Sequence, residues 1–423
     1  RDRHIRIFAG SSASWMTASS KSVVVKSPGP RNVDIDAKAR SFDAISLVVI
    51  SLGAFLLPLV GSRLKIPSIV LEIAFGIVVG PVLHLVEPSE FISGLAVLGF
   101  LLLMFLSGFE IELETFREKG LRTLAIPILV YLSTVGISFL IITELEYPIF
   151  LALVLCTTSV DIVISVLRSD DTIKTDYGQM LFIIALLADI LTLLAATVYA
   201  SVIKSNGVSI ENLNIILYFA IVIFLLRILR RLAWWNPQLF SRMFDGNDPE
   251  ELGIRSSLAL MLALVGVAVL FDIEAILGAF LAGTLFAFVF PNRGSLESSL
   301  KGFSYGFLIP IFFINIGLNY DISLFSNTDF YIDVLYLFGI AVLVKVLPSL
   351  LLIFSKISVA KILGGGFLLS ARFSLIIAMA EIGVELDLLT KNLEQQIILL
   401  AVLTATVSPL MFRLFNRTTE SSK

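Results

Sequence analysis

Long apolar runs, separated by short polar connections, fill the sequence from Phe42 almost to its end. A helix that crosses a membrane needs about 20 mostly apolar residues, and thirteen runs reach roughly that length. We therefore predict an all-α, polytopic membrane protein with about 13 transmembrane helices. The predicted spans are 43–61, 66–86, 92–109, 121–143, 147–167, 178–203, 212–232, 254–271, 273–290, 302–319, 330–354, 360–383 and 394–415.

The two ends of the chain differ from this apolar region. Residues 1–42 are polar, rich in Ser and basic residues and poor in acids, which is typical of either a disordered or a targeting segment. We assign 43–415 to one transmembrane domain and 416–423 to a short cytoplasmic tail.

Spans 8 and 9 are separated only by Phe271 and Asp272, which indicates a tight hairpin or a count that is one too high.

Composition excludes several classes of function. Hydrophobic residues make up 57% of the chain and charged residues 15%, whereas a soluble domain carries about 25% charged residues. A single cysteine, Cys156, excludes a disulfide framework within the chain. The histidines form no HExxH motif, and neither GxxxxGKS nor GxxxxGKT occurs, so we expect neither a zinc protease nor a nucleotide-driven pump. The net charge of −3 without a basic patch argues against a nucleic-acid partner.

Positive charge alternates along the connections between spans. The odd-numbered connections and the C-terminal tail carry most of the basic residues, among them Arg63, Lys119 and Arg293. The even-numbered connections carry Lys204 and Lys391. Because cytoplasmic loops hold the excess of Lys and Arg, we predict an odd number of spans with the C-terminus in the cytoplasm. We expect a plasma or inner membrane, or an organellar one if the N-terminal segment is a transit peptide.

Small residues at intervals of four predict close contacts between helices. Gly76 and Gly80 form a GxxxG motif, and Ala279 and Gly283 are also four residues apart. Such pairs let helix backbones approach each other inside a membrane. Pro310 lies within another span, where we expect it to kink the helix and free backbone carbonyls.

Ionisable residues within the predicted spans are few. A charged side chain at the centre of a span costs about 2.5–3.5 kcal/mol on insertion scales, so such residues pair with one another or line ion paths. Asp161 and Asp189 lie near the middle of their spans. The bases Lys345 and Arg372 do so as well, which indicates mutual compensation. The full set is Glu72, Asp161, Asp189, Glu274, Lys345, Arg372 and Glu381.

Polar residues interrupt two spans at symmetrical places in the chain. CTTSVD interrupts span 5, which precedes the span of Asp189, and SARFS interrupts span 12, which follows the span of Lys345. Paired interruptions in two halves indicate an inverted-repeat transporter with its site near the membrane midplane. We expect two broken helices that cross, with Asp161 and Arg372 neutralising the partial charges at the broken ends.

Eight stretches in this order resemble the cation:proton antiporter superfamily, in particular the monovalent cation:proton antiporter-2 family of sodium/hydrogen exchangers. They are IPSIVLEIAFGIVVGP, LGFLLLMFLSGFEIE, TTSVDIVISVL, LADILTLL, AILGAFLAGTLFA, FLIPIFFINIGLNYD, VLVKVLPS and SARFSLIIAMAEIG. The resemblance implies a thirteen-helix fold with a dimerisation part and a core that contains crossed broken helices. It further implies elevator-like alternating access, usually in a homodimer, without enzyme activity and without a cofactor besides the transported Na⁺ or K⁺ and H⁺.

The resemblance also implies roles for individual residues. Asp189 matches the family's aspartate that binds the proton and the metal cation. Thr158 and Ser159 match the unwound stretch of the first broken helix, and these too are candidate ion ligands. Lys345 matches the membrane lysine that faces the site, and Arg372 matches the basic residue of the second broken helix.

One position departs from the family pattern. Electrogenic members carry Asn-Asp or Asp-Asp at the binding pair, whereas this chain carries Ala188 and Asp189. Asp161 is the candidate substitute partner for the lysine and a further candidate ion ligand. Since one carboxylate binds either a proton or a cation with the same oxygens, we predict obligatory and electroneutral exchange.

Three other functions are compatible with parts of this pattern. A sodium-coupled organic-anion symporter can share the fold, with Arg372 binding the carboxylate of its substrate. An ion channel would conduct without exchange stoichiometry. A membrane enzyme is disfavoured, because the chain has no nucleophile–base pair or metal-ligand set. Na⁺, K⁺ and Li⁺ all prefer oxygen ligands, so the residues do not distinguish among these cations.

Overall fold

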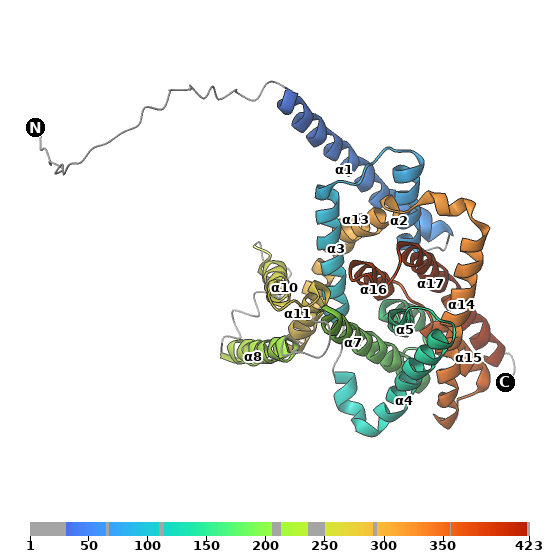
Figure 1. Ribbon diagram of the computed structural model, residues 1–423. Helices are drawn as coiled ribbons and strands as arrows, with labels where there is room; N and C mark the ends of the chain where they lie inside the picture. Colours follow the sequence, from blue (N-terminus) through green and yellow to red (C-terminus); the bar gives the residue numbers. More distant parts are fainter. Residues whose placement is uncertain are drawn as a thin grey trace, which may run out of the picture. The chain divides into compact units, whose positions relative to one another are not determined.

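The structure, a computed structural model, describes residues 31–64, 67–109, 114–204, 213–235, 250–290, 294–355 and 357–420. Every regular element in these ranges is a helix (Figure 1). The chain divides into two compact units, Arg1–Ala44 and Ile45–Lys423. Helix α1 (Arg31–Leu64) contains the membrane-spanning segment Ala44–Arg63, which agrees with the predicted span 43–61. Residues 31–42 of the predicted polar leader belong to the same helix. The remainder of the predicted polar leader lies outside the described residues.

Helices of membrane-spanning length follow one another along the second unit. They and their shorter neighbours are α2 (Ser68–Ile77), α3 (Glu90–Phe109), α4 (Glu114–Glu144), α5 (Ile149–Cys156), α6 (Val160–Ser169), α7 (Asp176–Lys204), α8 (Leu213–Trp235), α10 (Leu252–Leu270), α11 (Ala275–Val289), α12 (Gly294–Phe303), α13 (Ile309–Leu318), α14 (Thr328–Ser349), α15 (Val359–Leu369), α16 (Ser374–Glu385) and α17 (Lys391–Glu420). Within the described residues, nine helices are long and apolar enough to cross a membrane, and the bent pair α15–α16 makes a tenth. The shorter apolar helices Ser68–Val82 and Ala275–Val289 coincide with two further predicted spans. The count of thirteen remains a prediction.

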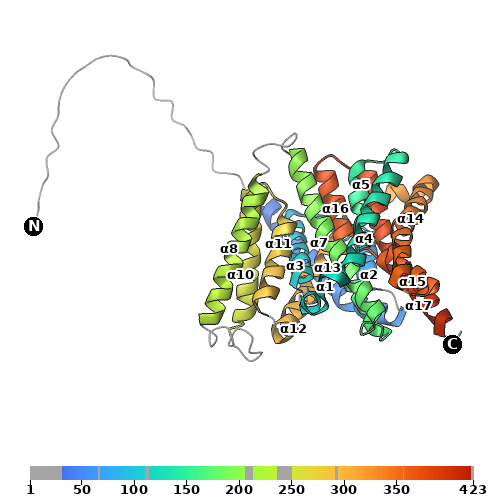
Figure 2. The ribbon, with the colours of Figure 1, turned by 90° about the horizontal axis from the view of Figure 1, so that it is seen from below.

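The helices of Ile45–Lys423 pack in two groups. Group I contains α2, α3, α8 and α10–α13, and its strongest contacts join α3 to α11 and α2 to α13. Group II contains α4–α7 and α14–α17, and its strongest contacts join α15 to α17 and α14 to α15. Figure 2 shows α8, α10 and α11 side by side, with α14, α15 and α17 at the other edge. The contacts between the groups include α7 with α11 and α3 with α16.

Glycines allow the close approach of helices in group I. A Cβ on Gly283 of α11 would overlap the Phe105 carbonyl oxygen of α3. A Cβ on Gly76 of α2 would likewise overlap the Ile314 carbonyl oxygen of α13. Both glycines belong to the small-residue pairs in the sequence, and the predicted helix packing is confirmed at these positions.

Pro310 acts differently from the sequence prediction. It lies in the first turn of α13, and the preceding residues Ser304–Leu308 form a short π-helix. The interruption therefore takes the form of a wider helical turn before the proline, rather than a kink at mid-helix. Proline lacks an N–H group, and a π-turn is one way in which a helix accommodates an interrupted hydrogen-bond ladder.

The predicted tight hairpin between spans 8 and 9 is confirmed, with Asp272 in the left-handed region at φ 56°.

Candidate functional site

The first broken helix consists of α5 and α6, separated by Thr157–Ser159. Thr157 and Ser159 have extended backbone conformations, with ψ of 153° and 110°. Thr157 and its neighbour Thr158 are each 1% exposed. Their position confirms the predicted interruption by the polar stretch CTTSVD, at which two half-helix ends are buried within the span.

The second broken helix consists of α15 and α16, which are bent by 47° at Ser370–Phe373. The two interruptions cross each other directly. The backbone N–H of Ser159 donates to the Ala371 carbonyl (2.8 Å), and Thr158 Oγ1 donates to the Leu369 carbonyl (3.1 Å). The crossed arrangement expected from the sequence is thus present.

Arg372 occupies the centre of this crossing. Its side chain is completely buried, and its guanidinium donates to four backbone carbonyls. The acceptors are Leu155 (2.7 Å), Ala341 (2.9 Å), Thr157 (3.2 Å) and Ser370 (3.4 Å). The last carbonyls of a helix have no partner within it and carry partial negative charge. Arg372 therefore stabilises the C-terminal end of α5 inside a membrane span, where water is not available.

Lys345 of α14 contacts the same helix end. It is 4% exposed, and its Nζ donates to the Cys156 carbonyl (2.6 Å) and to Thr158 Oγ1 (2.7 Å). The lysine and Arg372 thus take up three successive carbonyl oxygens of the first interruption, those of residues 155–157. The sequence predicted both side chains as charge-compensating groups, but not that backbone carbonyls would be their hydrogen-bond acceptors.

Asp189 lies on α7, which contacts all four half-helices of the crossing. Its neighbour Ala188 is 1% exposed, whereas Asp189 is only half-buried. The carboxylate makes no hydrogen bond with any residue that the structure describes, and it interacts electrostatically with Lys345. It therefore keeps its oxygens free beside a buried ammonium group.

The other two candidate ligands lie at the start of α6. Ser159 precedes the first residue of α6 and is 6% exposed. Asp161 lies in the first turn of α6 and is half-buried, so its carboxylate is placed at the positive end of that helix. This position agrees with the predicted role of Asp161 at a broken end. Its role as an ion ligand stays a prediction.

Sequence reasoning missed the contribution of α17 to the second interruption. Thr404 Oγ1 donates to the Arg372 carbonyl (3.4 Å), and the hydroxyls of Ser370 and Ser408 are 2.9 Å apart. Thr404 and Ser408 are four residues apart in an apolar span, so they share one face of the helix. That spacing was the available signal.

Two acidic residues of the predicted spans, Glu72 and Glu274, have different surroundings. Glu274 immediately precedes α11 and forms an ion pair with Lys204 (2.8 Å). Glu72 is 3% exposed and has no hydrogen-bond partner among the described residues. It lies in α2 one turn before Gly76, which packs against Ile314 of α13, and this contact of α2 with α13 accounts for its burial.

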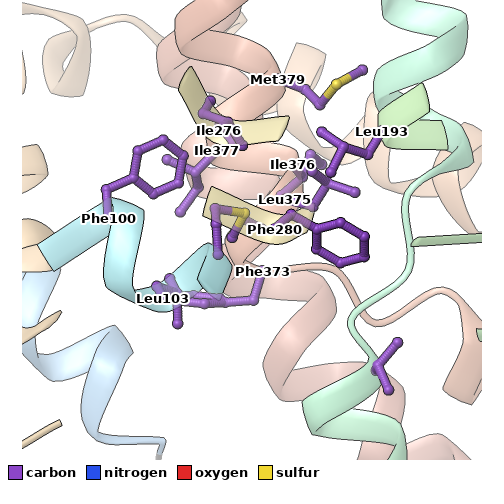
Figure 3. Close-up of a cluster of buried hydrophobic side chains, with 14 of the residues drawn as sticks. Phe100, Leu103, Leu193, Ile276, Phe280, Phe373, Leu375, Ile376, Ile377 and Met379 are labelled. Atoms are coloured by element: carbon purple, nitrogen blue, oxygen red, sulfur yellow. The ribbon is translucent and has the colours of Figure 1, made fainter. Parts of the chain in front are cut away.

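An apolar cluster separates the crossing from group I. Figure 3 shows Phe373, from the second interruption, among side chains of α3, α7, α11 and α16. Phe100, Leu103, Phe280 and Ile377 belong to the same cluster, and all are buried. The side chains that pack around Phe373 in this cluster are therefore apolar ones.

Crossed broken helices around a free carboxylate are the architecture of a secondary transporter with inverted repeats. Comparison with known proteins identifies the family. The family described as "Sodium/hydrogen exchanger, transmembrane" matches residues 50–415, and the chain belongs to that family. It is therefore an integral multi-pass membrane protein and not an enzyme.

Individual relatives agree with this assignment. The protein YjbQ of Bacillus subtilis is 30% identical over 392 residues, covering 87% of this chain and 62% of YjbQ. The Na⁺/H⁺-K⁺ antiporter GerN of Bacillus cereus is 29% identical over 360 residues, covering 83% of this chain and 90% of GerN. The structure of the sodium proton antiporter MjNhaP1 from Methanocaldococcus jannaschii has the same fold, with a TM-score of 0.62 and 16% identity over 88% of this chain and 96% of that one.

Proposed function

We propose that the protein exchanges a monovalent cation, Na⁺ or K⁺, for protons across a membrane by alternating access. One observation carries the proposal: Asp189 holds a carboxylate without a hydrogen bond among the described residues, on the helix that contacts both broken helices. A proton and a cation compete for the same carboxylate oxygens. Because the site must hold one or the other before it changes sides, the two fluxes are coupled.

We propose that oxygen atoms between α5 and α6 and at the start of α6 supply further ligands for a hard cation, since α7 contacts both of these helices. The proposed set is Asp189 together with Ser159, Asp161 and Thr158. In this conformation the Thr158 hydroxyl donates to the Leu369 carbonyl and accepts one hydrogen bond from Lys345, so one of its two acceptor lone pairs is left for a cation. The Lys345 ammonium group would repel a cation bound there, so we expect Lys345 to move away from this hydroxyl when the cation binds.

The names of related proteins support the choice of ions. GerN is named a Na⁺/H⁺-K⁺ antiporter, and MjNhaP1 is named a sodium proton antiporter. The chain spans less than two thirds of YjbQ, so this proposal concerns the membrane part that it matches. We further propose a homodimer in the lipid bilayer, with cations and protons as the transported ligands and no cofactor.

The surroundings of Arg372 favour antiport over the organic-anion symporter. In the symporter, the guanidinium would bind a substrate carboxylate and would need free N–H groups. Arg372 instead donates to four backbone carbonyls and is completely buried. Four of its five N–H donors are committed to backbone carbonyls, which leaves Asp189 as the group available for transport.

The test is exchange by purified protein in proteoliposomes. Recovery of an imposed pH gradient is measured after addition of Na⁺, K⁺ or Li⁺, and wild-type protein is expected to respond to at least one of them. Asp189→Asn should abolish the response while the melting temperature of the protein stays near that of the wild type. Asp170→Asn, at an ion pair at the end of α6, serves as the control and should retain exchange. Full exchange by a folded Asp189→Asn variant would contradict the proposal.

A further inference from the structure

A second polar region lies away from the crossing, between the two helix groups. A cavity of about 250 Å³ opens between α3 and α13 of group I and α16 and α17 of group II. Its polar lining comes from Asn315, Glu381, Lys391, Glu394 and Gln395. Because a water molecule needs about 10–15 Å³ of probe-occupied space, the cavity can hold a small cation together with several waters.

Glu381 is the distinctive residue of this lining. Every other residue from Ser374 to Gly383 on α16 is buried, whereas Glu381 is exposed into the cavity. A carboxylate in an otherwise apolar half-helix is costly unless it serves an ion path or a partner. It makes neither a hydrogen bond nor a salt bridge with the residues that the structure describes.

The remaining polar groups leave the cavity with a net negative charge. Lys391 Nζ is 2.6 Å from Glu394 Oε2, so the charge of this ammonium group is balanced by Glu394. Glu381 then remains as the uncompensated charge of the lining. The side-chain oxygen of Asn315 is also buried and has no hydrogen-bond partner among the described residues, and Asn315 lies in the wall of the same cavity. A carboxylate and an amide oxygen that no described residue engages together form the kind of lining that a hard cation binds.

The floor of the cavity is apolar. Phe100 and Phe312 line it and stack with their ring centroids 4.6 Å apart. Phe313, adjacent to Phe312, contacts Phe373 of the second interruption at 5.1 Å between ring centroids. The apolar cluster of Figure 3 therefore lies between the cavity and the crossing. In this conformation the apolar cluster separates a cation in the cavity from the crossing.

We propose that this cavity is a second cation site, which collects a hydrated monovalent cation before it reaches Asp189, with Glu381 as the attracting carboxylate. The cavity lies at the start of α3 and α17 and at the end of α13 and α16. The loop charges place these helix ends on the non-cytoplasmic side. The proposal rests on the proposed exchange function, since it names the entry site for the same ion.

The first test compares two carboxylates of α16 in membrane vesicles of uniform orientation. Glu381→Gln should raise the concentration of Na⁺ or K⁺ needed for half-maximal exchange from the non-cytoplasmic side about tenfold. This is the low end of the increase in local ion concentration that a cleft lined by one sign of charge produces. The value from the cytoplasmic side and the maximal rate should not change. Glu385→Gln removes an exposed carboxylate one turn away that does not line the cavity, and it should leave both values unchanged.

Equal effects of the two variants, or none from Glu381→Gln in vesicles with normal wild-type exchange, would overturn the inference. Absence of wild-type exchange would instead contradict the proposed function, so a binding measurement separates the two cases.

In Asp189→Asn protein, Na⁺ should still raise the melting temperature above that in an equal concentration of choline chloride. The added Glu381→Gln substitution should remove this shift. A shift that persists in the double variant, or that is absent from Asp189→Asn protein, also overturns the inference.

Discussion

Helices of group I meet through glycines, whereas the half-helices of group II meet through hydrogen bonds from charged side chains. At the contact of α3 and α11, Gly283 brings one backbone against another without polar side chains. At the crossing in group II, Arg372 and Lys345 replace the missing helical donors. Close packing of regular helices needs no polar partner because every backbone group is already paired within its helix. Interrupted helices lack this pairing, so charged residues are built into the membrane interior.

The largest expected effect comes from removing the guanidinium of group II. Arg372→Ala removes a donor from four buried carbonyls. Ala341 lies inside α14 and keeps its partner within the helix, but Leu155, Thr157 and Ser370 lie at the interruptions, where each unpaired buried group costs about 1–3 kcal/mol. We expect a loss of several kcal/mol in the free energy of unfolding together with loss of exchange. The measurement is the melting temperature in detergent, read beside proteoliposome exchange.

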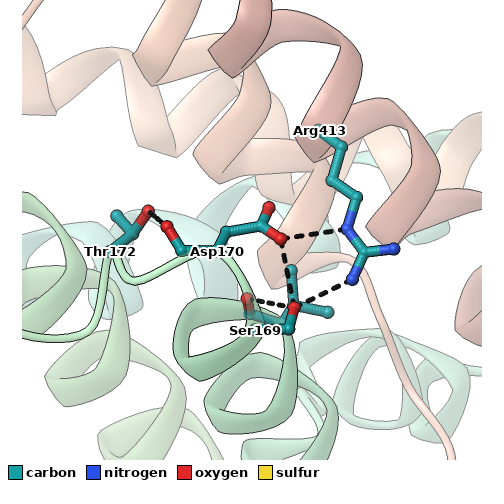
Figure 4. Close-up of polar contacts among 5 residues, drawn as sticks. Ser169, Asp170, Thr172 and Arg413 are labelled. Carbon is teal, nitrogen blue, oxygen red and sulfur yellow. Dashed lines mark hydrogen bonds and ion pairs between the residues drawn. The ribbon is translucent and has the colours of Figure 1, made fainter.

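Arg413 provides the matched control for this substitution. It joins α17 to the end of α6 through Asp170 Oδ1 (3.2 Å) and Ser169 Oγ (2.9 Å), as Figure 4 shows. Its side chain is 43% exposed, so Arg413→Ala should cost no more than about 1 kcal/mol. Similar losses of stability in the two variants would contradict the distinction between buried and exposed arginines.

The glycine contacts of group I should respond to a single methyl group. Gly283→Ala places a Cβ against the Phe105 carbonyl, and overpacking of this kind costs about 1–3 kcal/mol. Gly266→Ala is the control, since open space surrounds its Cβ and alanine favours helix by about 0.5–1 kcal/mol. Thermal unfolding of the two variants should therefore shift in opposite directions; a stabilised Gly283→Ala protein would show that α3 and α11 are free to separate.

A smaller effect is expected from the hydroxyl that links the two interruptions. Thr158→Val removes the acceptor of Lys345 and the donor to the Leu369 carbonyl. Loss of these hydrogen bonds should cost about 0.5–1.5 kcal/mol each, and the altered position of Lys345 should lower the exchange rate. Thr406→Val, which removes only a bond within α17, is the control in the same assays. Unchanged exchange in Thr158→Val protein would exclude a role of Thr158 in the site.

The smallest expected effect is that of membrane voltage. If Lys345 keeps its proton while it is bound to the Cys156 carbonyl and Thr158, one proton leaves Asp189 for each monovalent cation. Exchange then moves no net charge, whereas a net charge would couple to voltage by about 2.3 kcal/mol per 100 mV. Rates measured under potassium–valinomycin potentials of either sign should be equal. A dependence on that sign would show that the lysine takes part in proton transport.

Several features of the protein follow from the sequence alone. Apolar runs determine membrane-spanning helices because a helix satisfies its own backbone groups in lipid. Polar interruptions at CTTSVD and SARFS mark the two broken helices because each places several polar residues, one of them charged, next to one another in an apolar run. Asp189, Lys345 and Arg372 stand out because they are among the few charged residues near the middle of a span. Local composition is sufficient for these predictions, since each depends on the cost of placing a given residue in lipid.

Only the tertiary structure decided which groups these charges contact. Lys345 interacts electrostatically with the Asp189 carboxylate, but its hydrogen bonds go to the Cys156 carbonyl and Thr158. Backbone carbonyls are the same in every residue, so the sequence carries no sign of which ones are left unpaired. The cavity at Glu381 was also hidden, because it arises where four helices distant in the chain come together. Contacts between distant segments depend on how the helices pack, and that packing is a property of the whole fold.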